Sequence, residues 1–283
     1  TSKEKALNQH ELFSRFDHFG KTEYEELALH CSSFGIEFLS TAFDISSLNY
    51  IDSLVNLHKI ASADLTNIPL LRAIASKEKP VLLSTGASSF EEIDCAIEEL
   101  TNNGASEIVL LHCVLNYPTI DEKAYLGRIE SLSQKYPGFL LGYSDHTVPD
   151  SECLACIGAF SLGARVFEKH FTFDKNLEGN DHYHAMDAED LLKLNSRLEQ
   201  YVMMTKNPEE NEFLESQKDA IINARRSIVA STFISSGQIL TEKNLTTKRP
   251  GKGLSPLFWD DLIGKKAIVN LPQDHLVSLD DIE

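Results

Sequence analysis

The sequence has few basic residues and no long apolar run. Its 283 residues include 26 lysines and arginines against 43 aspartates and glutamates, a formal net charge of −17. General binding to nucleic acid or to an anionic membrane needs a basic footprint, so this balance disfavours both functions. No run approaches the roughly 18 apolar residues of a membrane span, and the first residues lack the apolar core of a signal peptide. We therefore expect a cytoplasmic protein that binds any anionic substrate through a few local cations.

Cysteine is also scarce. The five cysteines are Cys31, Cys95, Cys113, Cys153 and Cys156. An odd number of thiols, mostly within apolar segments, indicates reduced and buried side chains rather than a disulfide framework. Cys153 and Cys156 form a C-x-x-C pair, but its setting, ECLACIGAF, is typical of a buried helix face. For this pair we favour packing over redox or zinc chemistry.

Short apolar runs alternate with segments of helical period along most of the chain. The runs of strand length are 36–41, 57–62, 80–85, 107–113, 138–145 and 164–171. Between them, apolar residues recur three and four positions apart, and several segments end at glycine. Strands that are apolar on both faces indicate a parallel sheet covered by helices. Six such units fit an open doubly wound sheet or part of an eight-stranded barrel, and the lack of a glycine-rich dinucleotide fingerprint disfavours the first.

Polar residues cluster at the carboxyl ends of the predicted strands, the face that carries the active site in a β/α barrel. They are Thr41, Asp44, Ser62, Asp64, Ser84, Thr85, His112, Ser144, Asp145, His146, Glu168 and His170. Neighbouring strands lie about 4.8 Å apart, so the imidazoles of His146 and His170 can converge on one metal ion. A lone histidine is more often an ordinary core or surface residue, whereas this pair beside carboxylates favours metal binding.

Six motifs in order carry a family resemblance. They are KIASADLTNIPLL, LLSTGAS, LLHCVLNYP, GYSDHT, EKHFTFDKNLEGNDH and KRPGKGLSP. Together they resemble the sialic acid synthase family, the NeuB-like N-acetylneuraminate synthases, over nearly the whole chain. The resemblance implies a transferase that condenses phosphoenolpyruvate (PEP) with an N-acylated amino sugar similar to N-acetylmannosamine, giving a nonulosonic acid of the sialic type and phosphate. It also implies a (β/α)8 TIM-type barrel followed by a small antifreeze-like domain, the SAF domain.

The resemblance suggests how the chain is divided. We assign residues 1–204 to a partial barrel, 205–219 to a linker and 220–283 to the SAF-like domain. The linker is the polar stretch TKNPEENEFLESQKD, and short apolar stretches between turn residues support a compact, loop-rich unit after it. The family has a glutamate, a lysine and a glutamine on two earlier barrel strands, so we expect about six of the eight β/α units here. A piece shortened in this way, natural or not, is expected to be weakly active.

The resemblance also implies roles for individual residues. His146 and His170 match metal ligands for Mn²⁺ or Mg²⁺, and mixed nitrogen and oxygen ligation suits manganese. Glu168 lies two residues before His170, hence on the same strand face, where it could orient a ligand or place a water, while Lys169 should point toward the helices. With Lys59, these residues make up the expected catalytic set. The residues expected to hold PEP are Thr41, Lys59, Ser62, Ser84 and Ser144, because an ammonium and several hydroxyls suit a phosphate and a carboxylate.

On the sugar side, Tyr117 and Asp181 match family contacts. Arg249 matches an arginine that reaches from one subunit's SAF domain into its partner's barrel, which implies a domain-swapped homodimer. The loop NDHYHAMD replaces the commoner PDH and contains the pair His182 and His184. For this pair we favour loop structure or substrate contacts over a second metal site.

Departures near the sugar side, such as Ala63, Ala87 and Leu115, leave the acceptor open. Two other classes of protein also remain open. One is a different metal-dependent barrel enzyme, such as a lyase or hydrolase, which two histidines alone would permit. The other is an inactive sugar-binding or assembly homologue.

Overall fold

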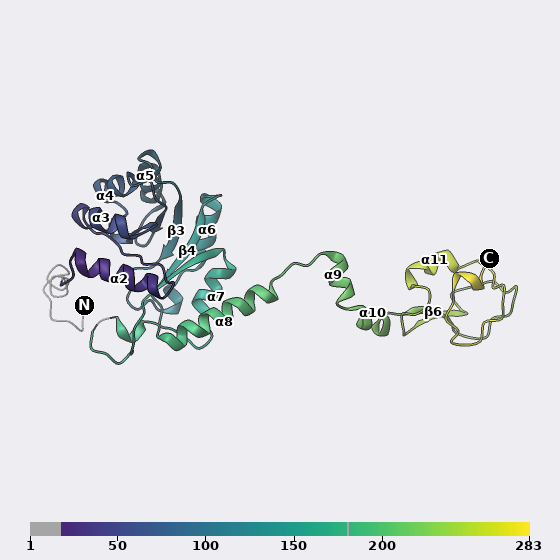
Figure 1. Cartoon of the computed structure of the whole chain (residues 1–283). Helices are drawn as coiled ribbons and strands as arrows, with labels where there is room; N and C mark the ends of the chain where they lie inside the picture. The colour runs from purple at the N-terminus through teal and green to yellow at the C-terminus, as the bar shows by residue number, and fades with distance from the viewer. Residues whose placement is uncertain (1–17, 180) are drawn as a thin grey trace. The chain divides into compact units, whose positions relative to one another are not determined.

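The computed structural model describes residues 18–179 and 181–283, which fall into two compact units, Thr1–Thr205 and Lys206–Glu283 (Figure 1). The helices of the first unit are α2 (Lys21–Ser33), α3 (Ile45–Ile51), α4 (Ile68–Ala75), α5 (Phe90–Asn102), α6 (Gly127–Lys135), α7 (Leu154–Ser161) and α8 (Ala188–Met204). Its strands are β1 (His58–Ile60), β2 (Val81–Ser84), β3 (Ile108–Cys113), β4 (Leu140–Asp145) and β5 (Ala164–Lys169). The second unit contains α9 (Glu210–Glu215), α10 (Lys218–Ala224), β6 (Ser227–Ala230), β7 (Leu245–Lys248) and α11 (Trp259–Leu262).

The five strands of the first unit form one parallel sheet in the order β1-β2-β3-β4-β5. Helices α4 to α7 connect successive strands, so the β/α alternation and the parallel sheet predicted from the sequence are confirmed. The predicted strand at 36–41 is wrong in extent, because only Thr41 pairs there, in a parallel bridge with Lys59. Strand β1 has three residues, which offers a neighbouring segment little backbone to pair with, and Ile36 and Leu39 remain exposed.

Alternate residues of each strand face opposite sides of the sheet, since the side-chain period of a strand is two. One side faces the helices. There Ile60, Leu83, Leu110 and Leu141 pack with apolar residues of α4 to α7 in a single buried cluster. The helix sequences support this arrangement: α5 starts at a capping box made by Ser89 and Glu92, which satisfies two backbone donors of its first turn.

The sheet is strongly curved. In a flat five-stranded sheet, β1 and β5 would lie about 19 Å apart, four steps of about 4.8 Å. Yet the Lys59 Nζ of β1 lies 3.5 Å from the Glu168 Oε2 of β5. Two side chains can meet across that span only if the sheet bends around its inner face, as in a barrel wall. The expected fold, a TIM-type barrel represented here by an incomplete set of strands, is confirmed for the described residues.

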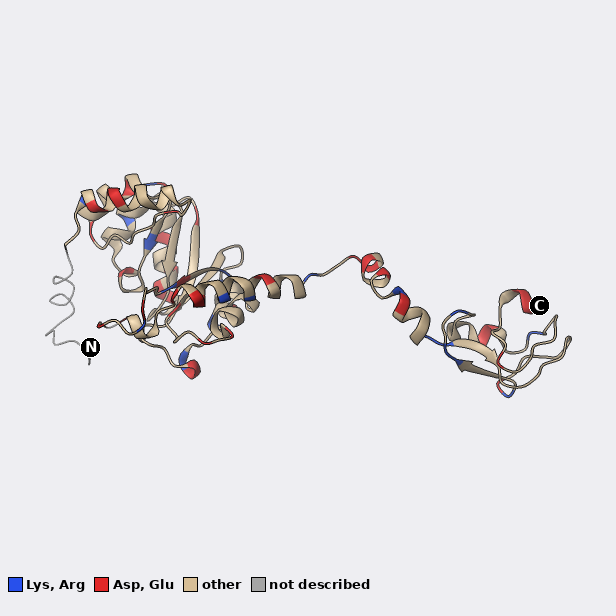
Figure 2. Ribbon diagram, turned by 60° about the horizontal axis from the view of Figure 1, so that its bottom comes forward, with Lys and Arg blue, Asp and Glu red and all other residues tan. Residues whose placement is uncertain are grey.

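The second unit is small and rich in loops. Strands β6 and β7 pair antiparallel, and single bridges such as Ile234 with Leu271 add short stretches of ladder. Its own buried cluster includes Ile228, Leu240 and Leu262, as expected for a compact SAF-like domain. Acidic residues recur on helices of both units, α8 and α9 among them (Figure 2).

The segment 205–219 contains helix α9, which has no buried residue. Its role as a linker stays a prediction. No helix in the described ranges is both long and apolar enough to cross a bilayer.

Candidate active site

The inner face of the sheet gathers polar side chains at the carboxyl ends of the strands. The register pairs Cys113 of β3 with Ser144 of β4, and Ser144 with Glu168 of β5. Because paired residues point the same way, these side chains share the inner face with Lys59 of β1 and Ser84 of β2. The residues that the sequence assigned to one site are therefore brought together by the sheet.

Glu168 contacts both Lys59 and Ser144. Lys59 is 5% exposed, and besides Glu168 its ammonium donates to the Ile60 carbonyl oxygen at 3.1 Å. The Ser144 hydroxyl donates to Glu168 Oε1 at 2.6 Å. A buried ammonium needs a compensating anion, and Glu168, whose side chain is 42% exposed, provides one within reach of water. At this point of the inner face, an anionic ligand can replace Glu168 as the ion-pair partner of Lys59.

Two more hydroxyls and a glycine complete this part of the face. The Ser62 hydroxyl oxygen accepts the Gly86 N–H at 2.9 Å. A Cβ on Gly86 would lie 2.8 Å from that oxygen and 3.1 Å from the Cys113 sulfur, so the close approach requires glycine. The Ser84 hydroxyl is buried and has no hydrogen-bond partner among the described residues. A buried polar group without a partner indicates a ligand contact.

His146 follows β4 and has one ring nitrogen fixed by the backbone. Its Nδ1 lies 2.7 Å from the Val114 carbonyl oxygen, and since a carbonyl only accepts, Nδ1 carries the proton and Nε2 presents a lone pair. Burial lowers the pKa of His146, which favours the neutral ring that a metal ion needs. Metal-ligating histidines commonly donate their other nitrogen to a carbonyl in this way. His146 therefore fits the role of a metal ligand.

His170 follows β5 and lies beside His146, with ring centroids 5.3 Å apart. Its Nδ1 lies 3.6 Å from the Asp181 Oδ2. The Tyr117 ring lies 4.2 Å from the His146 ring and 5.7 Å from that of His170, and partial burial raises the pKa of its hydroxyl to about 12. The four residues predicted for the metal and the sugar thus meet at one point.

The pair His182 and His184 divides into two roles. The His182 Nδ1 lies 2.7 Å from the Thr172 hydroxyl and anchors the loop, in line with the interpretation made from the sequence. His184 instead turns inward, and its ring lies 5.1 Å from that of His170. His170, Asp181 and His184 each offer one ligand atom within 4.8 Å of the others. His184 was not predicted to lie with the histidines that follow the strands.

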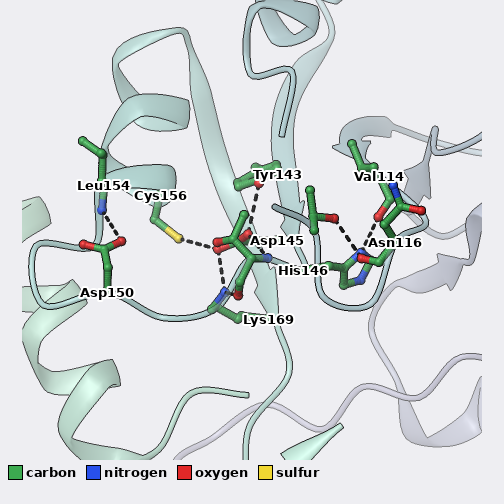
Figure 3. A network of polar contacts seen from close by, with 11 residues as sticks. Val114, Asn116, Tyr143, Asp145, His146, Asp150, Leu154, Cys156 and Lys169 are labelled. Carbon is green, nitrogen blue, oxygen red and sulfur yellow. Dashed lines mark hydrogen bonds and ion pairs between the residues drawn. The ribbon is translucent and has the colours of Figure 1, made fainter. Parts of the chain in front are cut away.

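Asp145 lies on the opposite side of β4 from the inner face, which corrects its place among the active-face residues (Figure 3). Lys169 Nζ donates to its Oδ2 at 2.7 Å and to the Thr147 carbonyl oxygen at 2.7 Å. The Tyr143 hydroxyl and the Thr147 N–H donate to its Oδ1. Lys169 therefore points toward the helices as expected, and the network fixes the turn that carries His146.

Two other expectations concern this side of the sheet. His112 also faces the helices, where its Nε2 lies 2.8 Å from the Ala124 carbonyl oxygen, so it too leaves the inner face. The Cys156 thiol donates to Asp145 at 3.5 Å. Cys153 and Cys156 are both buried in a cluster with Met186, which agrees with a packing role for the C-x-x-C pair.

Arg249 follows β7 in the second unit, and its side chain is exposed. The neighbouring Lys248 forms an ion pair with Asp274 at 2.5 Å. The structure describes the two units separately, so Arg249 is placed only within its own.

A cavity at the end of β2 and β3 lies beside the polar cluster. It has a volume of about 780 Å³ and lies between the ends of β2 and β3 and helix α6, lined by residues including Thr85, Cys113, Asn116 and Arg128. Of the inner-face residues described above, Cys113 also lines this cavity. We base the site on the converging side chains, because size alone shows no chemistry, whereas a buried lysine and paired histidines do.

The fold and this site define a β/α-barrel enzyme whose chemistry lies at the carboxyl ends of its strands. Comparison with known proteins gives the family. Residues 1–210 match the model of the NeuB family, and residues 225–283 match that of the SAF domain. The chain belongs to the NeuB family.

Individual relatives agree. An uncharacterised protein of Methanocaldococcus jannaschii is 37% identical over 98% of this chain and 81% of its own length. The N,N'-diacetyllegionaminic acid synthase of Campylobacter jejuni is 37% identical over 90% of this chain and 75% of its own. The crystal structure of an N-acetylneuraminic acid synthetase from Leptospira borgpetersenii is 33% identical, covers 71% of either chain and superimposes with a TM-score of 0.64.

Proposed function

We propose that the protein condenses PEP with an N-acylated amino sugar to form a nonulosonic acid and inorganic phosphate. Membership of the NeuB family supports this reaction, as does the similarity to a legionaminic acid synthase and to an N-acetylneuraminic acid synthetase. The observation that carries the proposal is the ion pair of buried Lys59 with Glu168, whose other carboxylate oxygen accepts from Ser144 on the inner face. In an acidic chain, this lysine is the cation that an anionic substrate needs at the strand ends.

PEP is held through its phosphate and its carboxylate. Lys59 supplies the positive charge, and the hydroxyls of Thr41, Ser62, Ser84 and Ser144 supply hydrogen bonds that fix the orientation of the enol. Ser84 has no hydrogen-bond partner among the described residues, and Lys59 can exchange Glu168 for the ligand. Binding then releases the Glu168 carboxylate from its ion pair.

Bond formation joins C3 of PEP to the aldehyde carbon of the open-chain sugar, the aldehyde oxygen takes up a proton to become a hydroxyl, and positive charge develops at C2. Glu168 places a water molecule against C2 and accepts its proton as the oxygen adds. The tetrahedral carbon collapses with cleavage of its bond to the phosphate oxygen, which leaves a 2-keto acid and phosphate. Glu168 suits this task because its side chain is partly open to water and its Oε1 is held by Ser144.

The sugar lies on the histidine side of the site. Tyr117 and Asp181 bind its hydroxyl and amide groups. His146 and His170 would hold a Mn²⁺ or Mg²⁺ ion, which when bound supplies Lewis-acid polarisation of the aldehyde. We further propose a domain-swapped homodimer in which Arg249 reaches the sugar from the partner's SAF domain, as the family resemblance implies.

Phosphate release tests the proposal. The protein should release inorganic phosphate only when PEP and an amino sugar are both present, with acceptors carrying one or two acetamido groups compared. Lys59→Ala should weaken PEP binding at least tenfold, or about 1.4 kcal/mol, because the ligand loses its buried cation. Lys123→Ala, which removes an exposed lysine that follows β3, is the matched control and should bind PEP like the parent. Phosphate release that ignores the sugar, or an unchanged PEP affinity in Lys59→Ala, would contradict the proposal.

A further inference from the structure

His184 is a buried histidine whose ring makes no hydrogen bond to the described residues. Its side chain is fully buried, and neither ring nitrogen has a hydrogen-bond partner among the described residues. Burying a polar ring in this way costs free energy, and histidines kept only for packing usually bond at least one nitrogen. The two bare nitrogens therefore indicate a partner outside the protein chain.

The position of His184 is fixed by backbone pairing with the end of β5. The Met186 N–H donates to the His170 carbonyl oxygen at 2.8 Å, and the Thr172 N–H donates to the Met186 carbonyl oxygen at 2.8 Å. Through this parallel bridge between Phe171 and Met186, the loop that carries His184 folds back alongside the end of β5. His182, bonded to Thr172, anchors the same loop from outside. The imidazole of His184 is thereby held against the ring of His170.

The surrounding groups have the composition of a metal site. The His184 Nε2 lies 3.9 Å from the Asp181 Oδ1, and the His170 Nδ1 lies 3.6 Å from the Asp181 Oδ2. All three ligand atoms lie within 4.8 Å of one another. Ligands about 2.1 Å from one ion are about 3.0–3.6 Å apart when they are neighbours in the shell, so the three side chains would move inward by about an ångström to close it. His146 adds a third ring, 5.3 Å from that of His170.

We propose that His184 is a metal ligand, and that it completes a single site with His146, His170 and Asp181. This inference deepens the proposed function and rests on its metal requirement. Three imidazoles and one carboxylate form a site richer in nitrogen than a pair of histidines. Nitrogen ligands favour transition metals, while Mg²⁺ prefers oxygen. The site therefore selects Mn²⁺, or another divalent transition metal, over Mg²⁺.

Binding of Mn²⁺ to the metal-free protein tests this directly, without turnover. Titration followed by electron paramagnetic resonance gives the affinity, and pulsed measurements count the coupled nitrogens. His184→Phe keeps a ring of similar size in the buried pocket and removes both nitrogens. It should weaken Mn²⁺ binding at least tenfold, remove one of three nitrogen couplings and reduce the preference for Mn²⁺ over Mg²⁺. His182→Ala, two residues away in the same loop, should keep all three couplings.

A variant that fails to fold would also lose Mn²⁺ binding, so circular dichroism first confirms the fold of each variant. His184→Asn, whose side chain is smaller and can still bind a metal weakly, is measured beside His184→Phe. Three couplings and unchanged affinity in His184→Phe overturn the inference, as does a parent protein that shows two couplings or binds no Mn²⁺. A parent with three couplings that makes no phosphate from PEP and any amino sugar leaves the inference intact and refutes the proposed function instead.

Discussion

Replacing Lys169 by methionine removes one half of a buried ion pair and leaves the other half in place. Asp145 is 2% exposed and the Lys169 side chain 8% exposed, and their nitrogen and oxygen lie 2.7 Å apart. Methionine keeps most of the length of the side chain, so packing changes little. What changes is that the Asp145 carboxylate loses its cation, and the Thr147 carbonyl oxygen loses a donor.

The expected cost follows from burial. Breaking a buried pair from one side destabilises a protein by about 3–5 kcal/mol, because an uncompensated charge remains. The pair of Lys135 with Asp94 has the same distance of 2.7 Å, but its side chains are 37% and 49% exposed. Exposed pairs contribute roughly 0–1 kcal/mol. Lys135→Met is therefore the matched control, and it should cost several-fold less than Lys169→Met.

The pH dependence has a definite sign. Burial alone would raise the pKa of Asp145, but Lys169 and the Thr147 N–H outweigh it and hold that pKa below its ordinary value. In the parent, this carboxylate stabilises the fold above the pKa of the unfolded chain, about 3.9, and the contribution is lost as the pH falls through the lower folded pKa. In Lys169→Met burial dominates, so the pKa rises and the cost disappears as the carboxyl becomes protonated. The difference between parent and variant should narrow from pH 7 to about pH 4.

Urea unfolding provides the assay. Far-ultraviolet circular dichroism follows the sheet and helices, while Trp259, the single tryptophan, reports the second unit by fluorescence. The dichroism transition should shift for Lys169→Met and the tryptophan transition should not. Adding Asp145→Asn should recover much of the loss, because no buried charge then remains. A loss below about 1 kcal/mol, equal to that of Lys135→Met, or a difference independent of pH would refute the reasoning.

Three further outcomes are expected. Gly86→Ala should weaken PEP binding, measured by calorimetry, because its Cβ would lie 2.8 Å from a serine oxygen of the site; unchanged affinity would show that the oxygen is not used. Mn²⁺ should raise the melting temperature of the parent, whereas the double variant His146→Ala/His170→Ala should show no rise; an equal rise would place the ion elsewhere. Mixed subunits of Arg249→Ala and Asp181→Ala should regain phosphate release, since one intact site forms per heterodimer; verified exchange without recovery would place Arg249 outside the partner's site.

Periodicity in the sequence was enough to predict the β/α order and the face on which side chains meet. Ser144 and Glu168 fall at one level because β4 and β5 pair there, and the alternation of side chains places Lys59 of β1 on the same side of the sheet. The same rule sends Asp145 and Lys169 to the other side. The alternation rule was applied to Lys169, whereas Asp145 was assigned to the active face only because it falls at the end of a strand.

What the sequence could not supply depends on contacts between distant segments. The strand at 36–41 was expected from its apolar run, yet pairing needs a partner, and β1 is too short to give one beyond Thr41. His184 meets His170 only because its loop folds back on the end of β5. An H-x-H pair in a polar loop does not indicate that the loop folds back onto a strand. The one available hint was its departure from the commoner family pattern.

The contact of Lys59 with Glu168 also has a consequence for folding kinetics. Neighbouring strands are consecutive along the chain, each pair joined by one helical connection, so their pairing can proceed stepwise with a moderate loss of entropy at each step. Lys59 and Glu168 belong to the first and last strands of the sheet, and they meet only after the whole ladder has curved. We expect such a contact to form only after the folding transition state. Loss of this contact should therefore raise the unfolding rate and leave the folding rate unchanged. A ligand bound between the two strands would lower the unfolding rate of the barrel wall.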